Sequence, residues 1–156
     1  KWSDNTSFVH STLAGQLGLY LVMWGPVQMA ADLPENYAKH MDAFQFIRDV
    51  AADWDDSKYI DAEPARYITV ARKAKGTNNW FVGGKCNQDG HKVSVKLDFL
   101  DAGRTYDCTI YADAKNADYE KNPMAYVITH KKVRRGDILK LTEAPGGGFG
   151  VSLIAK

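Results

Sequence analysis

The chain has 156 residues, enough for one domain or for one small domain plus a fragment of another. Hydrophobic residues make up 45% and charged residues 25%, as in an ordinary globular protein, and the net charge of +1 gives no reason to expect nucleic acid or an anionic membrane as a partner. The longest apolar run, residues 17–24, is far shorter than the ~20 residues needed to span a bilayer.

The first fifty residues follow a helical pattern. Apolar side chains recur at three- and four-residue spacing over residues 7–24, which predicts a helix that is buried on most sides. Gly15 and Gly18 each cost roughly 1 kcal/mol relative to alanine inside a helix, so we expect another backbone to pack closely against them. Gly25 and Pro26 predict the end of the helix.

Two short elements are predicted after this helix. Residues 27–31 have the composition of a short buried strand, and residues 43–50 have the apolar spacing of a second helix. An acidic loop that contains Pro34 lies between them. This order suits the closing units of a β/α barrel, so we expect the chain to be the tail of a larger enzyme.

Asp32 and Glu35 are the candidate substrate-binding residues. If residues 27–31 form a barrel strand, Asp32 lies at its C-terminal end, which is the catalytic rim of such barrels. The alternative is that both residues have a capping and loop role around Pro34. Any contact with substrate would be made in the parent enzyme.

From about Trp54 the apolar period changes to two. Residues 93–99 alternate most cleanly between apolar and polar side chains, and turn residues separate this strand from the others. The other predicted strands are residues 67–73, 80–84, 106–111, 126–133, 138–142 and 149–154. Short strands with frequent turns predict a mainly β fold, an antiparallel Greek-key-like β-sandwich over residues 53–156, preceded over residues 1–52 by an α-helical remnant of a barrel.

No motif in the sequence assigns a reaction. The four histidines show neither an i,i+4 pair nor the spacing of metal ligands, and no nucleophile elbow occurs. The glycine-rich stretch 146–150 enters a terminal strand with no helix after it, so it is interpreted as a turn with close backbone packing. We therefore predict no catalytic residue, no metal ligand and no cofactor in this chain.

Three further groups of residues have two interpretations each. The first is an acidic cluster that could hold calcium, or could be a solvated linker in which a tryptophan anchors the packing: Asp53, Trp54, Asp55 and Asp56. The second is a set of aromatic residues that could stack on sugars, or could belong to the core and to cross-strand pairs: Trp80, Tyr119 and Tyr126. The third is the cysteine pair. Cys108 is expected to be a free buried thiol, and a disulfide with Cys86 is the alternative.

In its order of motifs the chain resembles the C-terminal portion of glycoside hydrolase family 97, the α-glucosidase and α-galactosidase type. The resemblance covers nearly the whole chain. The matching stretches are residues 11–37, 44–50, 53–59, 67–76, 79–83, 109–114 and 144–149.

The resemblance implies a parent enzyme with an N-terminal β-sandwich, a catalytic β/α barrel and a C-terminal β-sandwich. The parent would hydrolyse α-glycosidic bonds with paired carboxylates. The family's catalytic glutamates and calcium-binding carboxylates precede the matched region, so no position here inherits them. The resemblance further implies that the chain braces the barrel as a non-catalytic accessory domain in a periplasmic or secreted bacterial protein. A carbohydrate-binding or protein-interaction module, with an oligosaccharide as partner, is the alternative.

The isolated chain is predicted to self-associate. The helix over residues 7–24 is apolar nearly all round, and outside a barrel it lacks most of its partners. A second copy of the chain is the simplest replacement for them, which predicts a homo-oligomer.

Overall fold

The computed structural model describes residues 11–23, 41–50 and 53–156. Within these residues two helices precede eight strands. The helices are α1 (Leu13–Met23) and α3 (Met41–Asp49). The strands are β1 (Trp54–Glu63), β2 (Tyr67–Ala74), β3 (Trp80–Cys86), β4 (His91–Lys96), β5 (Thr105–Asp113), β6 (Tyr126–Arg134), β7 (Ile138–Glu143) and β8 (Gly148–Ala155). No helix in the described ranges is long and apolar enough to cross a membrane.

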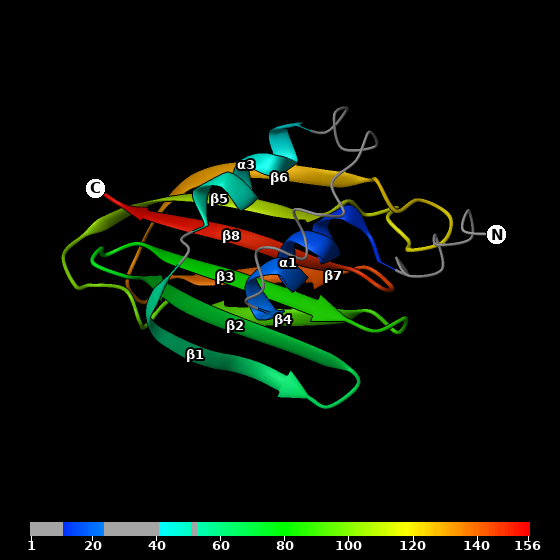
Figure 1. Ribbon diagram of the computed structural model, residues 1–156, viewed down its shortest axis with the longest axis horizontal. Coiled ribbons are helices and arrows are strands. Elements are labelled where there is room, and N and C mark those ends of the chain that lie inside the picture. Colours follow the sequence, from blue (N-terminus) through cyan, green and yellow to red (C-terminus); the bar gives the residue numbers. More distant parts are fainter. Residues whose placement is uncertain (1–10, 24–40, 51–52) are drawn as a thin grey trace.

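The strands form two antiparallel sheets. The larger sheet has the order β1-β2-β3-β8-β5-β6, and β4 pairs with β7 in a separate two-stranded sheet. Strand β8 returns from the smaller sheet to lie between β3 and β5, which is a Greek-key type of connection. In Figure 1 the helices lie in front of the larger sheet and the smaller sheet lies behind it. The predicted mainly β, antiparallel sandwich is confirmed.

The core of the sandwich lies between the two sheets. Inward-facing residues alternate with exposed ones along β4 and β7, as the period-two pattern predicts. The largest contributors to this core are Trp80, Val82, Val95, Leu97, Tyr106, Leu139, Phe149, Val151 and Leu153. Because the smaller sheet has only two strands, it covers only part of that face of the larger sheet.

The helices close the opposite face of the larger sheet. Leu13, Leu17 and Leu21 recur every four residues along α1 and are buried over β3 and β8. Phe46 of α3 is fully buried, with its ring centroid 6.3 Å from that of Phe81 and 5.5 Å from that of Tyr111. The second predicted helix is therefore confirmed, and the described part of the helical segment shares a core with the sandwich.

Glycines allow α1 to lie directly on the backbone of the sheet, as predicted. A Cβ atom added to Gly18 would lie 2.0 Å from the Gly84 carbonyl oxygen and 2.5 Å from that of Phe149. From the sheet side, a Cβ on Gly148 would lie 3.0 Å from the Cα of Gly15. Side chains at these positions would push the helix away from the sheet.

The ends of α1 are held by side-chain hydrogen bonds. At the start, the Gly15 amide donates to the Thr12 hydroxyl at 3.0 Å, which is an N-cap contact. At the other end, Arg72 of β2 donates from Nε to the Leu21 carbonyl at 2.9 Å and from Nη2 to the Val22 carbonyl at 3.0 Å. A guanidinium can thus satisfy carbonyls that the helix itself leaves unpaired.

Two predictions from the sequence are wrong: the start of the first helix and the linker around the acidic cluster. The first helix begins at Leu13 and not near residue 7, because Thr12 caps it there. Strand β1 replaces the linker predicted around the acidic cluster. It was missed because it is a mostly exposed edge strand with two breaks in its register against β2, so it shows no alternation. The strand predicted at residues 27–31, the helix end at Gly25 and the domain boundary at residue 52 fall outside the described residues.

Candidate functional site

The predicted site residues are not placed by the structure. Asp32 and Glu35 both lie outside the described residues. A substrate-binding role for them in a parent enzyme therefore stays a prediction.

The described residues instead gather polar groups at one end of the sandwich. Glu143, the last residue of β7, is only 2% exposed and is the one charged side chain in the described ranges that is fully buried. Burial raises the pKa of its carboxyl to about 8, with Asp113 and Asp61 adding to the rise and Lys85 opposing it. Neither carboxyl oxygen has a hydrogen-bond partner of ordinary geometry among the described residues, and the nearby Cys86 thiol opposes the rise in pKa only as the smallest of the contributions.

Asp113, the last residue of β5, fastens the loop between β7 and β8. Its Oδ2 accepts hydrogen bonds from the Ala144 and Gly148 amides, both at 2.9 Å. Burial raises the pKa of this carboxyl, and hydrogen bonds from Thr12 and from these two amides oppose the rise. The hydrogen-bonded oxygen thus has the geometry of a structural anchor.

A histidine contact joins the smaller sheet to the edge of the larger one. The Nε2 of His91 on β4 lies 2.9 Å from Oδ2 of Asp61 on β1. The His91 ring also stacks on Tyr67 of β2, with centroids 3.7 Å apart and an interplanar angle of 9°. These contacts orient the imidazole toward the edge strands.

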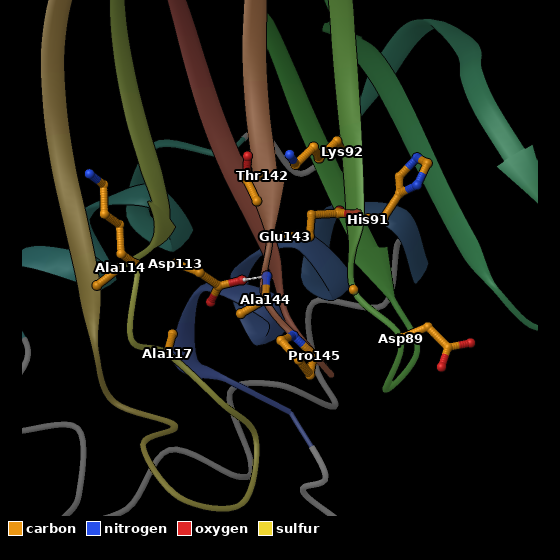
Figure 2. A pocket seen from close by; sticks show the side chains of 12 residues that line it. Asp89, His91, Lys92, Asp113, Ala114, Ala117, Thr142, Glu143, Ala144 and Pro145 are labelled. Atoms are coloured by element: carbon orange, nitrogen blue, oxygen red, sulfur yellow. Dashed lines mark hydrogen bonds between the residues drawn. The ribbon is translucent and has the colours of Figure 1, made fainter.

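A pocket of about 530 Å³ opens beside these groups. Figure 2 shows Glu143 and His91 on the paired strands β7 and β4, and Asp113 bonded to the backbone of Ala144. The walls also carry exposed polar side chains, including Asp89, Lys92, Lys115 and Thr142. A general acid or nucleophile must reach an atom of its substrate. Both oxygens of Glu143 and Oδ1 of Asp113 have almost no accessible area, so a molecule bound in this pocket would not reach these three atoms.

The acidic cluster at the start of β1 makes exposed ion pairs and a backbone hydrogen bond, and calcium binding there stays an untested alternative. Asp53 pairs with Lys75 at 3.5 Å, Asp55 accepts from the Gly76 amide at 2.9 Å, and Asp56 lies 3.6 Å from Lys58. The three carboxylates thus have separate partners. No group of three or more His, Cys, Asp or Glu side chains that could hold a metal occurs in the described ranges.

Trp80, Tyr126 and Trp54 make contacts within the fold, and both cysteines are buried. Trp80 is only 4% exposed and belongs to the sandwich core, so the interpretation as a surface sugar-stacking residue is wrong for it. The Tyr126 hydroxyl donates to Asp42 of α3. Trp54 packs against Phe81 with ring centroids 6.0 Å apart, which confirms its role as a packing anchor. Both cysteines are free and buried, as predicted for Cys108.

Sequence reasoning did not single out Glu143 or Asp113. A signal for Glu143 was present, because it continues the inward-facing series of Leu139 and Leu141 at a spacing of two. No comparable signal marked Asp113, whose partners come from a loop 31 and 35 residues further along the chain.

Comparisons with known proteins identify the family. Residues 53–154 match the family model described as "Glycosyl-hydrolase 97 C-terminal, oligomerisation". A retaining alpha-galactosidase of Bacteroides thetaiotaomicron is 32% identical over 142 residues, which is 91% of this chain and 21% of the relative. A probable retaining alpha-galactosidase of Streptomyces bingchenggensis is 29% identical over 136 residues, which is 87% of this chain and 20% of the relative. The chain thus spans about one fifth of the length of these curated relatives.

Solved structures give the same result. A glycoside hydrolase family 97 enzyme of a Pseudoalteromonas species has 32% sequence identity and a TM-score of 0.83, covering 94% of this chain and 23% of that one. A variant of that enzyme is known in complex with panose, and the enzyme is known in complex with acarbose. The chain therefore belongs to glycoside hydrolase family 97, as a portion that includes the C-terminal domain of that family.

Proposed function

We propose that the chain is the C-terminal part of an enzyme that hydrolyses α-glycosidic bonds, and that it braces the catalytic barrel without taking part in the chemistry. The observation that carries this proposal is the seating of α1 on the sandwich. In the parent α1 would belong to the barrel, and its backbone lies in contact with β3 and β8 across Gly18 and Gly148. A barrel element and the sandwich would then share one core, which fixes one relative to the other.

The names of the relatives support the substrate class. Two curated relatives are called alpha-galactosidases, and the solved relative binds panose and acarbose. Nitrophenyl α-galactoside and nitrophenyl α-glucoside are therefore the two substrates to compare. The part of the parent that precedes this chain would supply the catalytic carboxylates and any calcium. Within this chain, Asp32 and Glu35 are the candidate residues for contact with substrate.

The experiment compares the 156-residue chain with a protein that also contains the upstream reading frame. We expect background hydrolysis of both substrates by the chain alone and turnover of at least one by the longer protein. Turnover by the purified chain that is lost in Asp32→Asn or Glu35→Gln would overturn the accessory role. An upstream frame that encodes no barrel would overturn the parentage.

A second function, self-association, is supported by the surface of α1. Leu13, Leu17 and Leu21 are covered by the sheet, but Leu19 and Val22 stay partly exposed on the far side of the helix. The description of the matching family model also includes oligomerisation. We propose that a second copy of the chain covers this side of α1.

Light scattering tests the self-association. We expect a mass above the 17.4 kDa of the monomer for the chain, and a monomer for Leu19→Glu. Gln45→Glu adds the same charge on the exposed side of α3 and should leave the mass unchanged. A monomeric chain at micromolar concentration would exclude this interface.

The alternative of a carbohydrate-binding module has weaker support, because Trp80 lies in the core. A change in tryptophan fluorescence on adding maltooligosaccharide or an α-galactoside would favour that alternative. The compartment is proposed to be the periplasm or the exterior of a bacterial cell. The bacterial origin of the relatives supports the organism class, and fractionation of producing cells tests the compartment.

A further inference from the structure

Glu143 lies at an inward-facing position of β7, where the alternating pattern of the strand predicts an apolar residue. Along this strand Leu139, Leu141 and Glu143 face inward, whereas Ile138, Lys140 and Thr142 are exposed. The carboxyl lies against β3, where a Cβ atom added to Gly84 would come within 2.6 Å of its Oε1. The missing side chain of Gly84 thus leaves a space that the carboxyl shares with the Phe149 ring, whose nearest atom would lie 2.2 Å from the added Cβ.

Charged and titratable groups face Glu143 from four neighbouring strands. Asp113 comes from β5, Lys85 and Cys86 from β3, and Asp61 from β1. His91 is the direct partner of Glu143 in the register of β4 against β7. Strand β8 contributes no charged side chain.

The neighbouring groups are bonded to other partners. Lys85 donates to the carbonyls of Cys86 at 2.8 Å and Gly146 at 3.1 Å. The Cys86 thiol lies 3.2 Å from the Ala144 carbonyl oxygen, and His91 is bonded to Asp61. An ionised Glu143 would therefore be a buried charge without a hydrogen-bonded counter-ion.

The turn that follows Glu143 is hydrogen-bonded to the residue before α1 and to the end of β3. Its Gly146 carbonyl accepts from the Thr12 amide at 3.2 Å, just before α1, and its Gly147 carbonyl accepts from the Cys86 amide at 2.9 Å at the end of β3. Its Gly146 amide donates to the Asn87 carbonyl at 2.8 Å. A movement of this turn would disturb the seating of α1 and the end of β3 together.

We propose that Glu143 is a proton-dependent latch: the closed sandwich holds a proton on this carboxyl, and release of the proton to solvent loosens the 144–148 turn from α1 and β3. The direction follows from linkage. The ordinary pKa of 4.5 rises to about 8 in the closed state, so between these values the closed state binds a proton that the open state lacks. Each unit of pH in this window should favour opening about tenfold, and the effect should level off above it.

Hydrogen exchange tests the latch on the full chain. Protection factors of the Thr12 and Cys86 amides, which already correct for the intrinsic pH dependence of exchange, should fall about tenfold per pH unit from about pH 5 to pH 8. The fall should be absent in Glu143→Gln, which keeps the shape of the neutral acid. Glu120→Gln is the matched control at an exposed glutamate and should behave as wild type.

Parallel protection profiles in the wild type and in Glu143→Gln would overturn the proposal. Carbon-13 NMR of the glutamate carboxyls in the wild type gives a second measurement that needs no variant to fold. The expected result is a titration of Glu143 centred near pH 8. A midpoint close to the ordinary value of a glutamate would equally overturn the latch. This latch would act in the chain whatever reaction the parent enzyme catalyses.

Discussion

Replacing Gly18 with alanine tests how closely α1 lies on the sheet. The new Cβ would approach two backbone carbonyl oxygens, at 2.0 Å on Gly84 and 2.5 Å on Phe149, whereas ordinary contacts begin at 3.4 Å. Because both oxygens belong to paired strands, the helix has to move away by about 1 Å or more. That movement would loosen the contacts of Leu13, Leu17 and Leu21 with the sheet.

The magnitude follows from two opposing effects. Alanine in place of glycine stabilises a helix by about 1 kcal/mol. Overpacking in a core costs about 1–3 kcal/mol, and a clash with two rigid carbonyls belongs at the upper end of that range. We therefore expect Gly18→Ala to lower the free energy of unfolding by about 2 kcal/mol.

Gly15→Ala is the matched control in the same helix. Its nearest neighbour would be the Ser11 hydroxyl at 2.5 Å, on a side chain that can rotate, and the nearest backbone atom lies 3.0 Å away. The gain in helix propensity from alanine then offsets most of the free energy lost through this closer packing. Urea unfolding of the wild type and both variants gives the comparison. If Gly18→Ala were as stable as Gly15→Ala, the close contact between α1 and the sheet would be wrong.

Three other predictions concern the end of α1, the turn over residues 144–148 and the burial of the two cysteines. Arg72→Leu removes the donors to the last carbonyls of α1 and should lower the free energy of unfolding in urea by about 1–2 kcal/mol. The control Arg66→Leu breaks an exposed ion pair and should change that free energy by less than about 0.5 kcal/mol. Equal losses in the two variants would exclude the capping role of Arg72. Asp113→Ala leaves two amides unpaired and should lower the free energy of unfolding by about 2 kcal/mol or more. Asp113→Asn should lower it by less than half of that, because the amide oxygen still accepts. Equal losses would mean that these hydrogen bonds contribute little. Burial raises the pKa of the Cys86 thiol to about 12 and that of Cys108 to about 11, so both thiols should resist alkylation near pH 8 until the protein is denatured, as mass spectrometry would show. Rapid alkylation of the folded chain, or an intact disulfide, would contradict this.

Local patterns in the sequence were sufficient for much of the fold. Alternation over β4 and β7 predicted their inward faces, because each residue of a strand turns its side chain to the opposite side from the previous one. Gly15 and Gly18 predicted a close backbone contact, because glycine inside a helix otherwise only weakens it. The order of motifs was also specific enough to indicate the family that the comparisons confirm.

Other features of the fold depend on which strands and helices lie against one another, and only the tertiary structure shows this. β1 is a strand because β2 offers it an edge, although its own charged residues show no strand pattern. Glu143 is buried because its carboxyl lies against Gly84 of β3 in the other sheet, and an acidic side chain by itself would be expected at the surface. The order β1-β2-β3-β8-β5-β6 likewise depends on contacts between residues far apart in the chain, which a period of two along one strand does not encode.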